Sequence, residues 1–301
     1  MTRRWITESL GADAFEQLAT GLAGSELSSV LLEVMRQRAE ARTPAEVLAQ
    51  YQRDAFCRPA AIDQRVSLEI DRHLLAAADG FEAIELSPVA PLAACSRVAR
   101  TGQNRVLSAL RSTEIVADPT NVLALECAAR LRAGATAVHL ATSQRVIRTQ
   151  PVPKRPGMAS HFRIFVLASG GIEAKDHAFT AAALERHIRT MLAALDRLEA
   201  HGYAFGARRV DVLATPARAA LADRIAGSLD GIAVHRKPLD HPYYSAGLRY
   251  MLWVTAPDGA ELPLIDGGAF DWLAQLASNR CAAYVATGAG AQLIAFRFRA
   301  R

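Results

Sequence analysis

The sequence predicts an α+β protein with an antiparallel sheet. The strands come as hairpins: residues 143–150 and 161–169 flank a proline-rich loop, and residues 248–255 and 261–265 flank a tight turn. Residues 178–200 carry their leucine, isoleucine and methionine side chains on one stripe, which is typical of a long amphipathic helix. Hairpins, rather than regular strand–helix alternation, favour an antiparallel sheet flanked by helices.

Residues 1–63 predict a helical extension that precedes the core at 64–301. Apolar residues between Leu27 and Met35 recur at helical spacing. Thr43-Pro44-Ala45-Glu46 is a helix start, with a threonine cap, a proline in the first turn and a glutamate three residues after the cap. We expect this helix to run to about Arg53. The extension has no catalytic signature and is expected to pack on the core or on a partner protein.

The remaining elements follow from local patterns of apolar residues, glycine and proline. We expect helices at about 68–78, 121–133 and 216–228, a helix opened by Gly267-Gly268, and strands at 81–86, 106–117 and 209–214.

Charge and cysteine content exclude several classes of function. The net charge of +5 is compatible with phosphate-bearing ligands, but no run of five basic residues suggests a nucleic-acid tract. No stretch approaches eighteen apolar residues, so no membrane span is expected. Cys57, Cys95, Cys127 and Cys281 form no CxxC pair, which argues against a zinc site. Scattered thiols without an export signal indicate a reducing, cytoplasmic location.

Six segments, in this order, resemble the core of class II aminoacyl-tRNA synthetases of the histidyl branch. The segments are Gly80–Pro88 (motif 1), Val116–Thr120, the pair Arg145–Gln150 and His161–Phe165 (motif 2), Leu239–Tyr244, Ile265–Leu273, and Val285–Gly288 (motif 3). Val116–Thr120 is closer to the regulatory paralogue of ATP phosphoribosyltransferase than to the synthetases. The resemblance covers about residues 65–296; the alternative is an unrelated α+β protein whose hairpins mimic the order.

The resemblance implies a nucleotide site at Arg148, Arg163 and Phe165. Arg148 matches the motif 2 arginine that holds the α-phosphate of ATP, and a planar guanidinium suits bidentate contacts to phosphate. Arg163 matches the second motif 2 arginine and Phe165 the aromatic that stacks on adenine. The alternatives are surface salt bridges for the arginines and a core position for Phe165. ATP, with Mg²⁺, is the cofactor that the resemblance implies, and no other metal site is expected.

The resemblance also implies an amino-acid site at Asp118, Thr120, Tyr243, Tyr244, Gly267 and Gly268. Asp118 matches the carboxylate that accepts hydrogen bonds from a ligand amino group, and the tyrosines match those around the imidazole pocket. A two-residue insertion before Tyr243 leaves the register of the tyrosine motif open. The alternatives are a helix cap for Asp118 and a half-buried aromatic pair for the tyrosines. If the resemblance holds, Asp118, Arg148, Arg163, Phe165 and Tyr243 meet in one cleft.

Departures from the family pattern argue against efficient adenylate formation. Gly290 and Ala291 stand where motif 3 carries its glutamate and the arginine that holds the γ-phosphate, Gln150 replaces the motif 2 glutamate, and Ala269 replaces the arginine after the paired glycines. Losing transition-state charge stabilisation costs on the order of a hundredfold in rate. No catalytic residue is assigned, and the chain ends too soon after motif 3 for an anticodon-binding domain.

Three functions remain open. The favoured one is a degenerate paralogue that binds an amino acid, an adenine nucleotide or both, and acts as a regulatory or binding subunit. The second is a ligase that activates an amino acid for an acceptor other than tRNA, and the third is an interaction protein with a vestigial pocket. A homodimer through Phe81–Pro88 is expected, a protein partner can contact the helical extension, and tRNA is not an expected partner.

Overall fold

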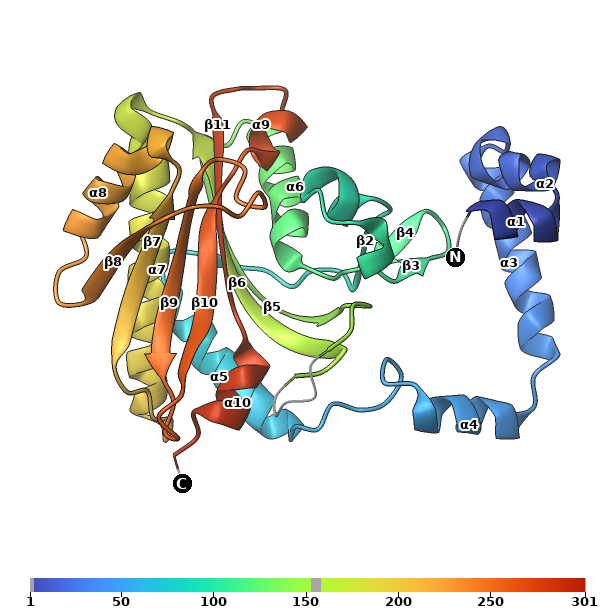
Figure 1. Cartoon of the computed structure of the whole chain (residues 1–301), viewed down its shortest axis with the longest axis horizontal. Coiled ribbons are helices and arrows are strands. Elements are labelled where there is room, and N and C mark those ends of the chain that lie inside the picture. The colour runs from blue at the N-terminus through green and yellow to red at the C-terminus, as the bar shows by residue number, and fades with distance from the viewer. Residues whose placement is uncertain (1–2, 153–157, 301) are drawn as a thin grey trace.

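A mostly antiparallel eight-stranded sheet forms the centre of the protein (Figure 1). The computed structural model describes residues 3–152 and 158–300. Across the sheet, the strands are β1 (Glu82–Ala83), β5 (Ala137–Ile147), β6 (His161–Ile172), β11 (Ala282–Ala289), β10 (Glu261–Phe270), β9 (Leu248–Thr255), β7 (Arg208–Ala214) and β8 (Ala233–Pro238). Only the two edge pairs, β1 with β5 and β7 with β8, are parallel. The predicted α+β class with an antiparallel sheet is therefore confirmed.

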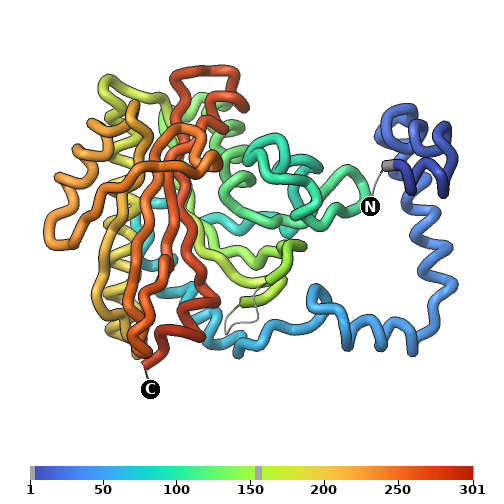
Figure 2. Tube along the Cα trace, in the orientation of Figure 1, coloured from blue at the N-terminus to red at the C-terminus, as the bar shows by residue number. Residues whose placement is uncertain are grey.

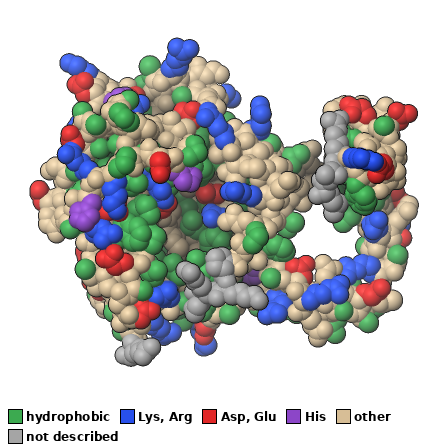
Figure 3. All heavy atoms as spheres, in the orientation of Figure 1, with side chains coloured by type: hydrophobic (Ala, Val, Ile, Leu, Met, Phe, Trp, Pro, Cys, Tyr) green, Lys and Arg blue, Asp and Glu red, His purple; other side chains and the backbone are tan. Residues whose placement is uncertain are grey.

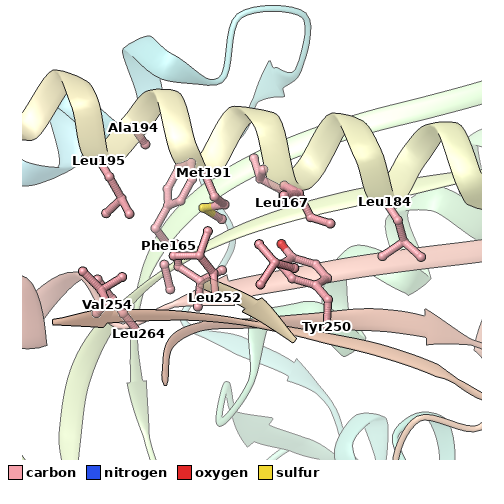
Figure 4. Close-up of a cluster of buried hydrophobic side chains, with 14 of the residues drawn as sticks. Phe165, Leu167, Leu184, Met191, Ala194, Leu195, Tyr250, Leu252, Val254 and Leu264 are labelled. Atoms are coloured by element: carbon pink, nitrogen blue, oxygen red, sulfur yellow. The ribbon is translucent and has the colours of Figure 1, made fainter. Parts of the chain in front are cut away.

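One face of the sheet carries the larger apolar core. It is covered by α5 (Gln64–Ala77), α7 (Ala178–Glu199), α8 (Ala219–Gly227) and α10 (Ala291–Arg297). The apolar stripe of α7, which includes Leu184, Met191 and Leu195, packs on Phe165 and Leu252 of the strands (Figure 4). Each such side chain contributes roughly 1.5–3 kcal/mol on burial, so this layer supplies much of the stability.

The opposite face carries a smaller core and a small second sheet. It is covered by α6 (Pro119–Arg132) and α9 (Trp272–Leu276). The second sheet has the order β2 (Val89–Pro91), β4 (Thr113–Ile115) and β3 (Ser108–Ala109), and the short turns η2 (Ala94–Val98) and η3 (Gln103–Arg105) lie beside it.

Residues 4–53 contribute nothing to either core. They form α1 (Arg3–Leu10), α2 (Ala12–Glu16), η1 (Gln17–Gly21), α3 (Gly24–Glu40) and α4 (Pro44–Arg53), and none of these side chains is buried. Figure 2 shows this arm leading away from the sheet and joined to it through the segment before α5. The α4 helix begins as predicted, with Thr43 accepting from the Glu46 amide at 3.3 Å and the Glu46 carboxylate accepting from the Thr43 amide at 2.7 Å. No helix among the described residues is long and apolar enough to cross a membrane.

Several predicted elements need correction. Gly267 and Gly268 do not open a helix but lie inside β10, and the helix that follows begins only at Trp272. Residues 81–86 form a strand only at 82–83, and residues 106–117 form two short strands instead of one. The short turns η4 (Lys175–His177) and η5 (Pro216–Arg218) precede α7 and α8. Part of the proline-rich loop, residues 153–157, lies outside the described residues.

A buried histidine links α7 to two strands. The Nε2 and Nδ1 atoms of His187 lie 2.9 Å from Ser169 Oγ and 3.0 Å from Thr287 Oγ1, and the Tyr250 hydroxyl donates to Thr287. Burial lowers the pKa of His187 from 6.5 to about 3, so the ring stays neutral in the folded protein.

His187 predicts acid-sensitive stability. In the unfolded chain its pKa returns to about 6.5, so below that pH the unfolded state binds a proton that the folded state excludes until about pH 3. The contribution of His187 is thus complete above pH 6.5 and falls by about 1.4 kcal/mol per pH unit below it. Urea unfolding from pH 7.5 to 5 should show this slope, reduced by about that amount in His187→Gln. An unchanged slope in the variant would contradict the assignment.

Candidate functional site

A cavity of about 370 Å³ opens on the face of the sheet that carries α6. The space-filling view shows this face hollowed between the large sheet and the small one, with Lys and Arg side chains around the hollow (Figure 3). The cavity is lined by Cys95, Ala99, Thr101, Arg105, Ala117, Asp118, Thr120, Arg148, Gln150, Ile164, His241, Tyr243, Tyr244, Arg249, Asp266, Gly267, Phe270, Ala286 and Gly288.

Asp118 caps α6 and also faces the cavity. Its Oδ1 accepts from the Thr120 amide at 3.0 Å and from the Thr120 hydroxyl at 2.8 Å, which is the N-cap arrangement. Among the described residues, its Oδ2 accepts one long hydrogen bond, 3.3 Å, from the Tyr243 hydroxyl. A carboxylate has about four acceptor sites, so Oδ2 retains capacity for a donor from a ligand.

Arg148 lies beside Asp118, just after β5. Its Nε donates to the Ala117 carbonyl at 2.9 Å, and its guanidinium carbon lies 5.1 Å from the centre of the Phe162 ring. One terminal nitrogen is 3.6 Å from Asp118 Oδ2, which is an ion pair but too long for a hydrogen bond. The backbone contact and the ring fix the guanidinium of this cavity-lining residue, and one terminal nitrogen faces the Asp118 carboxylate.

The two predicted tyrosines stand at one end of the cavity in an aromatic cluster with Phe270 and Trp272. Burial raises the pKa of both Tyr243 and Tyr244, so both hydroxyls stay protonated. The Tyr244 hydroxyl donates to Asp266 at 2.5 Å, and Tyr243 donates to Asp118. The tyrosines therefore hold the two cavity carboxylates in place.

Asp266 and Arg249 form a second ion pair in the cavity wall. Arg249 donates to both Asp266 oxygens, at 3.0 and 2.7 Å, and its guanidinium carbon lies 4.9 Å from the centre of the Tyr244 ring. Neither residue was predicted for the site. Asp266 belongs to the Ile265–Leu273 segment, directly before the paired glycines, so the sequence held a signal for it. Arg249 lies in an apolar strand pattern and belongs to no motif.

The paired glycines allow close packing around the site. A Cβ on Gly268 would lie 2.4 Å from the Leu248 carbonyl oxygen and 2.5 Å from the Tyr244 ring, so glycine lets the ring approach β10 closely. A Cβ on Gly267 would lie 2.3 Å from Thr287 Oγ1. Gly267 lines the cavity with its backbone. Gly268 does not line the cavity but leaves room for the Tyr244 ring, which does.

Arg163 and Phe165 do not reach the cavity, contrary to the expected common cleft. They lie on the opposite face of β6, where Arg163 pairs with Asp71 of α5 at 2.9 Å and Phe165 is fully buried under α7. Side chains alternate along a strand, so Phe162 and Ile164 face the cavity side and odd-numbered residues face away. Arg163 and Phe165 thus stand one residue away from the positions whose side chains face the cavity. Phe165 occupies the core position that the sequence offered as its alternative.

The motif 3 region supplies no cation either. Gly288 lines the cavity, Gly290 caps α10, and Ala291 is buried in the core under α10. Gln150 lines the cavity rim, whereas Ala269 faces the α7 core. Arg105, which no motif indicated, reaches the cavity from η3. Among residues 3–152 and 158–300, no three His, Cys, Asp or Glu side chains are grouped so as to hold a metal ion.

This sheet, with its helices and the cavity beside α6, is a class II aminoacyl-tRNA synthetase-like fold, as predicted from the six segments. An ATP phosphoribosyltransferase regulatory subunit/histidyl-tRNA synthetase from Bacillus halodurans is similar over 78% of this chain and 80% of its own, with TM-score 0.58 and 16% identity. A histidine–tRNA ligase subunit from Alicyclobacillus acidocaldarius is similar over 79% and 95%, with TM-score 0.58 and 14% identity.

Apo S. aureus histidyl-tRNA synthetase is similar over 77% of this chain and 64% of its own, with TM-score 0.55 and 13% identity. No protein-family model matches the sequence, and no curated protein matches it. At these identities the likeness concerns the fold.

The two aromatic residues of β6 predict separable effects. Phe165→Leu should lower the free energy of unfolding by about 1–2 kcal/mol, because it opens space under α7. It should leave ligand affinity at the cavity unchanged. Phe162→Leu removes the ring beside Arg148 and should weaken ligand binding. Because Phe162 is only partly buried against the small core at Val116 and Val146, its cost in stability should be smaller than that of Phe165→Leu. Urea denaturation and calorimetric titration with an aminoacyl-adenylate analogue measure both quantities. A loss of affinity in Phe165→Leu alone would restore Phe165 to the site.

Proposed function

We propose that this chain is a synthetase-like paralogue whose cavity binds an α-amino acid, free or joined to an adenylate-type group, and that it acts as a binding or regulatory subunit. The observation that carries the proposal is the adjacency of Asp118 and Arg148, 3.6 Å apart in one cavity wall. An α-amino acid carries an ammonium group and a carboxylate on the same carbon. A carboxylate beside a guanidinium, each with free hydrogen-bonding capacity, complements that pair of charges.

The neighbouring groups suit the same ligand. The Asp118 carboxylate is held by Thr120 and Tyr243, so little ordering is needed when an ammonium group binds. Arg148 is fixed through Nε, which leaves its terminal nitrogens for a carboxylate or phosphate. The Arg249–Asp266 pair and the Tyr244 hydroxyl then face the side chain of the amino acid, and they favour a polar one.

Binding without efficient activation follows from the charges that are missing. Arg163 points away from the cavity, and Gly290 and Ala291 bring no guanidinium to it. Ground-state affinity can persist under these conditions, because transition-state stabilisation needs additional contacts to the reacting phosphate. The Bacillus halodurans neighbour is named as an ATP phosphoribosyltransferase regulatory subunit/histidyl-tRNA synthetase, and the first part of that name supports a regulatory role by analogy of fold.

The first test is a ligand panel with Asp118→Asn. Asparagine keeps the helix cap but removes the charge, so the variant should fold with near wild-type stability. We expect a standard amino acid or its sulfamoyl-adenosine analogue to raise the melting temperature of the wild type. Affinity should fall at least tenfold in Asp118→Asn, since a charge-assisted hydrogen bond contributes about 1.5–3 kcal/mol.

Asp63→Asn is the matched control, because Asp63 also caps a helix, α5, and lies outside the cavity. It should leave affinity unchanged. Equal affinity in wild type and Asp118→Asn, or no shift with any ligand of the panel, would contradict the proposal.

One observation favours the second candidate, an amino-acid-activating ligase for an acceptor other than tRNA. Arg105 lines the cavity and has no ion-pair partner among the described residues, so it could meet a phosphate. ATP–pyrophosphate exchange separates the candidates. We expect no exchange with histidine, whereas robust exchange with any standard amino acid would replace the regulatory proposal by the ligase.

We also propose a homodimer through the segment Phe81–Pro88. The strand β1 within it is the edge of the large sheet, and Glu82, Ala83 and Glu85 are exposed there. An isologous contact would use this edge twice. Sedimentation at micromolar concentration should show a dimer, and Ala83→Arg should shift it towards monomer, whereas Ala207→Arg, exposed before β7, should not. A wild-type monomer would rule out this interface.

A further inference from the structure

A second cavity, of about 380 Å³, lies on the other face of the β5–β6 hairpin. It is bounded by the segment that joins the arm to α5, by the first turns of α5 and by side chains of the two strands. Its lining includes Pro59, Ala60, Ile62, Arg145, His161 and Arg163. The first cavity faces the opposite side of the same strands, so the two share no side chain.

Two arginines stand directly opposite each other in this cavity. Arg145 of β5 and Arg163 of β6 are cross-strand partners on one face of the sheet. Like charges in this position repel each other and destabilise the pairing. The pair therefore needs a compensating negative charge.

The described part of the chain supplies only half of that charge. Arg163 pairs with Asp71 at 2.9 Å, and Asp71 also accepts from Ser143 at 2.5 Å. Arg145 has no carboxylate partner among residues 3–152 and 158–300. Burial and the charge of Arg163 lower the pKa of Arg145, which means that these surroundings disfavour its positive charge. Two guanidinium groups thus share one carboxylate.

The neighbouring histidine does not supply the missing charge. Arg145 is 3.1 Å from His161 Nδ1, and because a guanidinium only donates, Nδ1 accepts. His161 Nε2 then carries the hydrogen and donates to the Arg58 carbonyl at 2.8 Å. The ring ties Arg145 to the segment before α5, and both of its nitrogens have hydrogen-bond partners.

A donor in the cluster is also left over. The Nε atom of Arg163 is buried and has no hydrogen-bond partner among the described residues. Buried donors without a partner are uncommon and point to a missing acceptor. An anion with several acceptor oxygens would satisfy both the unpaired donor and the uncompensated positive charge at this cavity.

We propose that this second cavity binds the phosphate group of a small phosphorylated molecule. A phosphate group would supply the negative charge that Asp71 leaves uncompensated and offer oxygens to both planar guanidinium groups. The volume of about 380 Å³ falls in the range of small-molecule sites, which suits a phosphate ester. Pro59, Ala60 and Ile62 form one wall, so the bound ligand would hold the base of the arm against the sheet.

The test measures binding and its location together. Inorganic phosphate and glycerol 3-phosphate are titrated calorimetrically into the full chain, and hydrogen exchange is followed with and without each. We expect binding with slowed exchange in residues 59–67. Tighter binding of the ester would assign the site to a phosphorylated molecule. Equal affinity for the two ligands would show that the cavity binds free phosphate and would contradict a phosphate ester as its ligand.

The diagnostic variant is Arg145→Gln. It should weaken phosphate binding at least tenfold and, without phosphate, be at least as stable as the wild type, because the like-charge pair is gone. Arg38→Gln, which removes the same charge from the exposed α3, should change neither. Asp118→Asn should keep the protection of residues 59–67, which separates this site from the amino-acid cavity.

Phosphate affinity equal in Arg145→Gln and wild type would overturn the proposal, as would a wild type without protection at 59–67 in millimolar phosphate. Should Arg145→Gln fail to fold, the exchange pattern of the wild type still decides. Slowed exchange at 59–67 supports the site, and slowed exchange only elsewhere contradicts it.

Discussion

The strict alternation of side chains along the β5–β6 hairpin is the constraint on which the arrangement of this protein depends. Even-numbered positions such as Val146 and Ile164 face α6 and the first cavity, and odd-numbered positions such as Phe165 and Leu167 face α7. Because a one-residue shift would exchange the two faces, the core under α7 also fixes which side chains reach the cavity. Arg148 falls on the cavity side, whereas Arg145 and Arg163 fall on the side of α5.

The Asp118 carboxylate has a structural role as a helix cap and, in the proposed function, a binding role as well. One oxygen caps α6 and is satisfied by Thr120, which fixes the plane of the group. The other oxygen is left facing Arg148 and Tyr243 with only long contacts. The cap and the ligand site were weighed as alternatives, but the geometry makes them compatible. The same logic applies to Tyr244, which packs on Gly268 and donates to Asp266.

The sequence predicted the fold because its signals were local and repeated. The hairpin at 248–255 and 261–265, the long helix at 178–200 and the capped helix at Thr43 rest on periodicity and capping, and the structure has all three. The helix expected at Gly267-Gly268 was wrong because glycines were taken as a break, whereas here they permit close contacts within a strand.

The candidate site was predicted only in part, because a site depends on contacts between distant segments. Asp118, Thr120, Arg148 and the tyrosines carried motif signals and lie together. Arg163 and Phe165 carried equal motif signals, but their side chains face away from the cavity, because packing of the core decides which residues of β6 face each side. Arg105 and Arg249 had no motif, and only the folding of η3 and β9 against the cavity brings them into it.

In the proposed function, the Asp118–Arg148 pair receives the charges of an amino acid. A crystal structure of the protein with an aminoacyl-sulfamoyl adenosine, its amino acid chosen by the thermal panel, tests this most directly. We expect the ammonium nitrogen within hydrogen-bonding distance of Asp118 Oδ2 and the acyl or sulfamoyl oxygens at the terminal nitrogens of Arg148. A ligand bound elsewhere, or one in this cavity with its ammonium group away from Asp118, would contradict the claim.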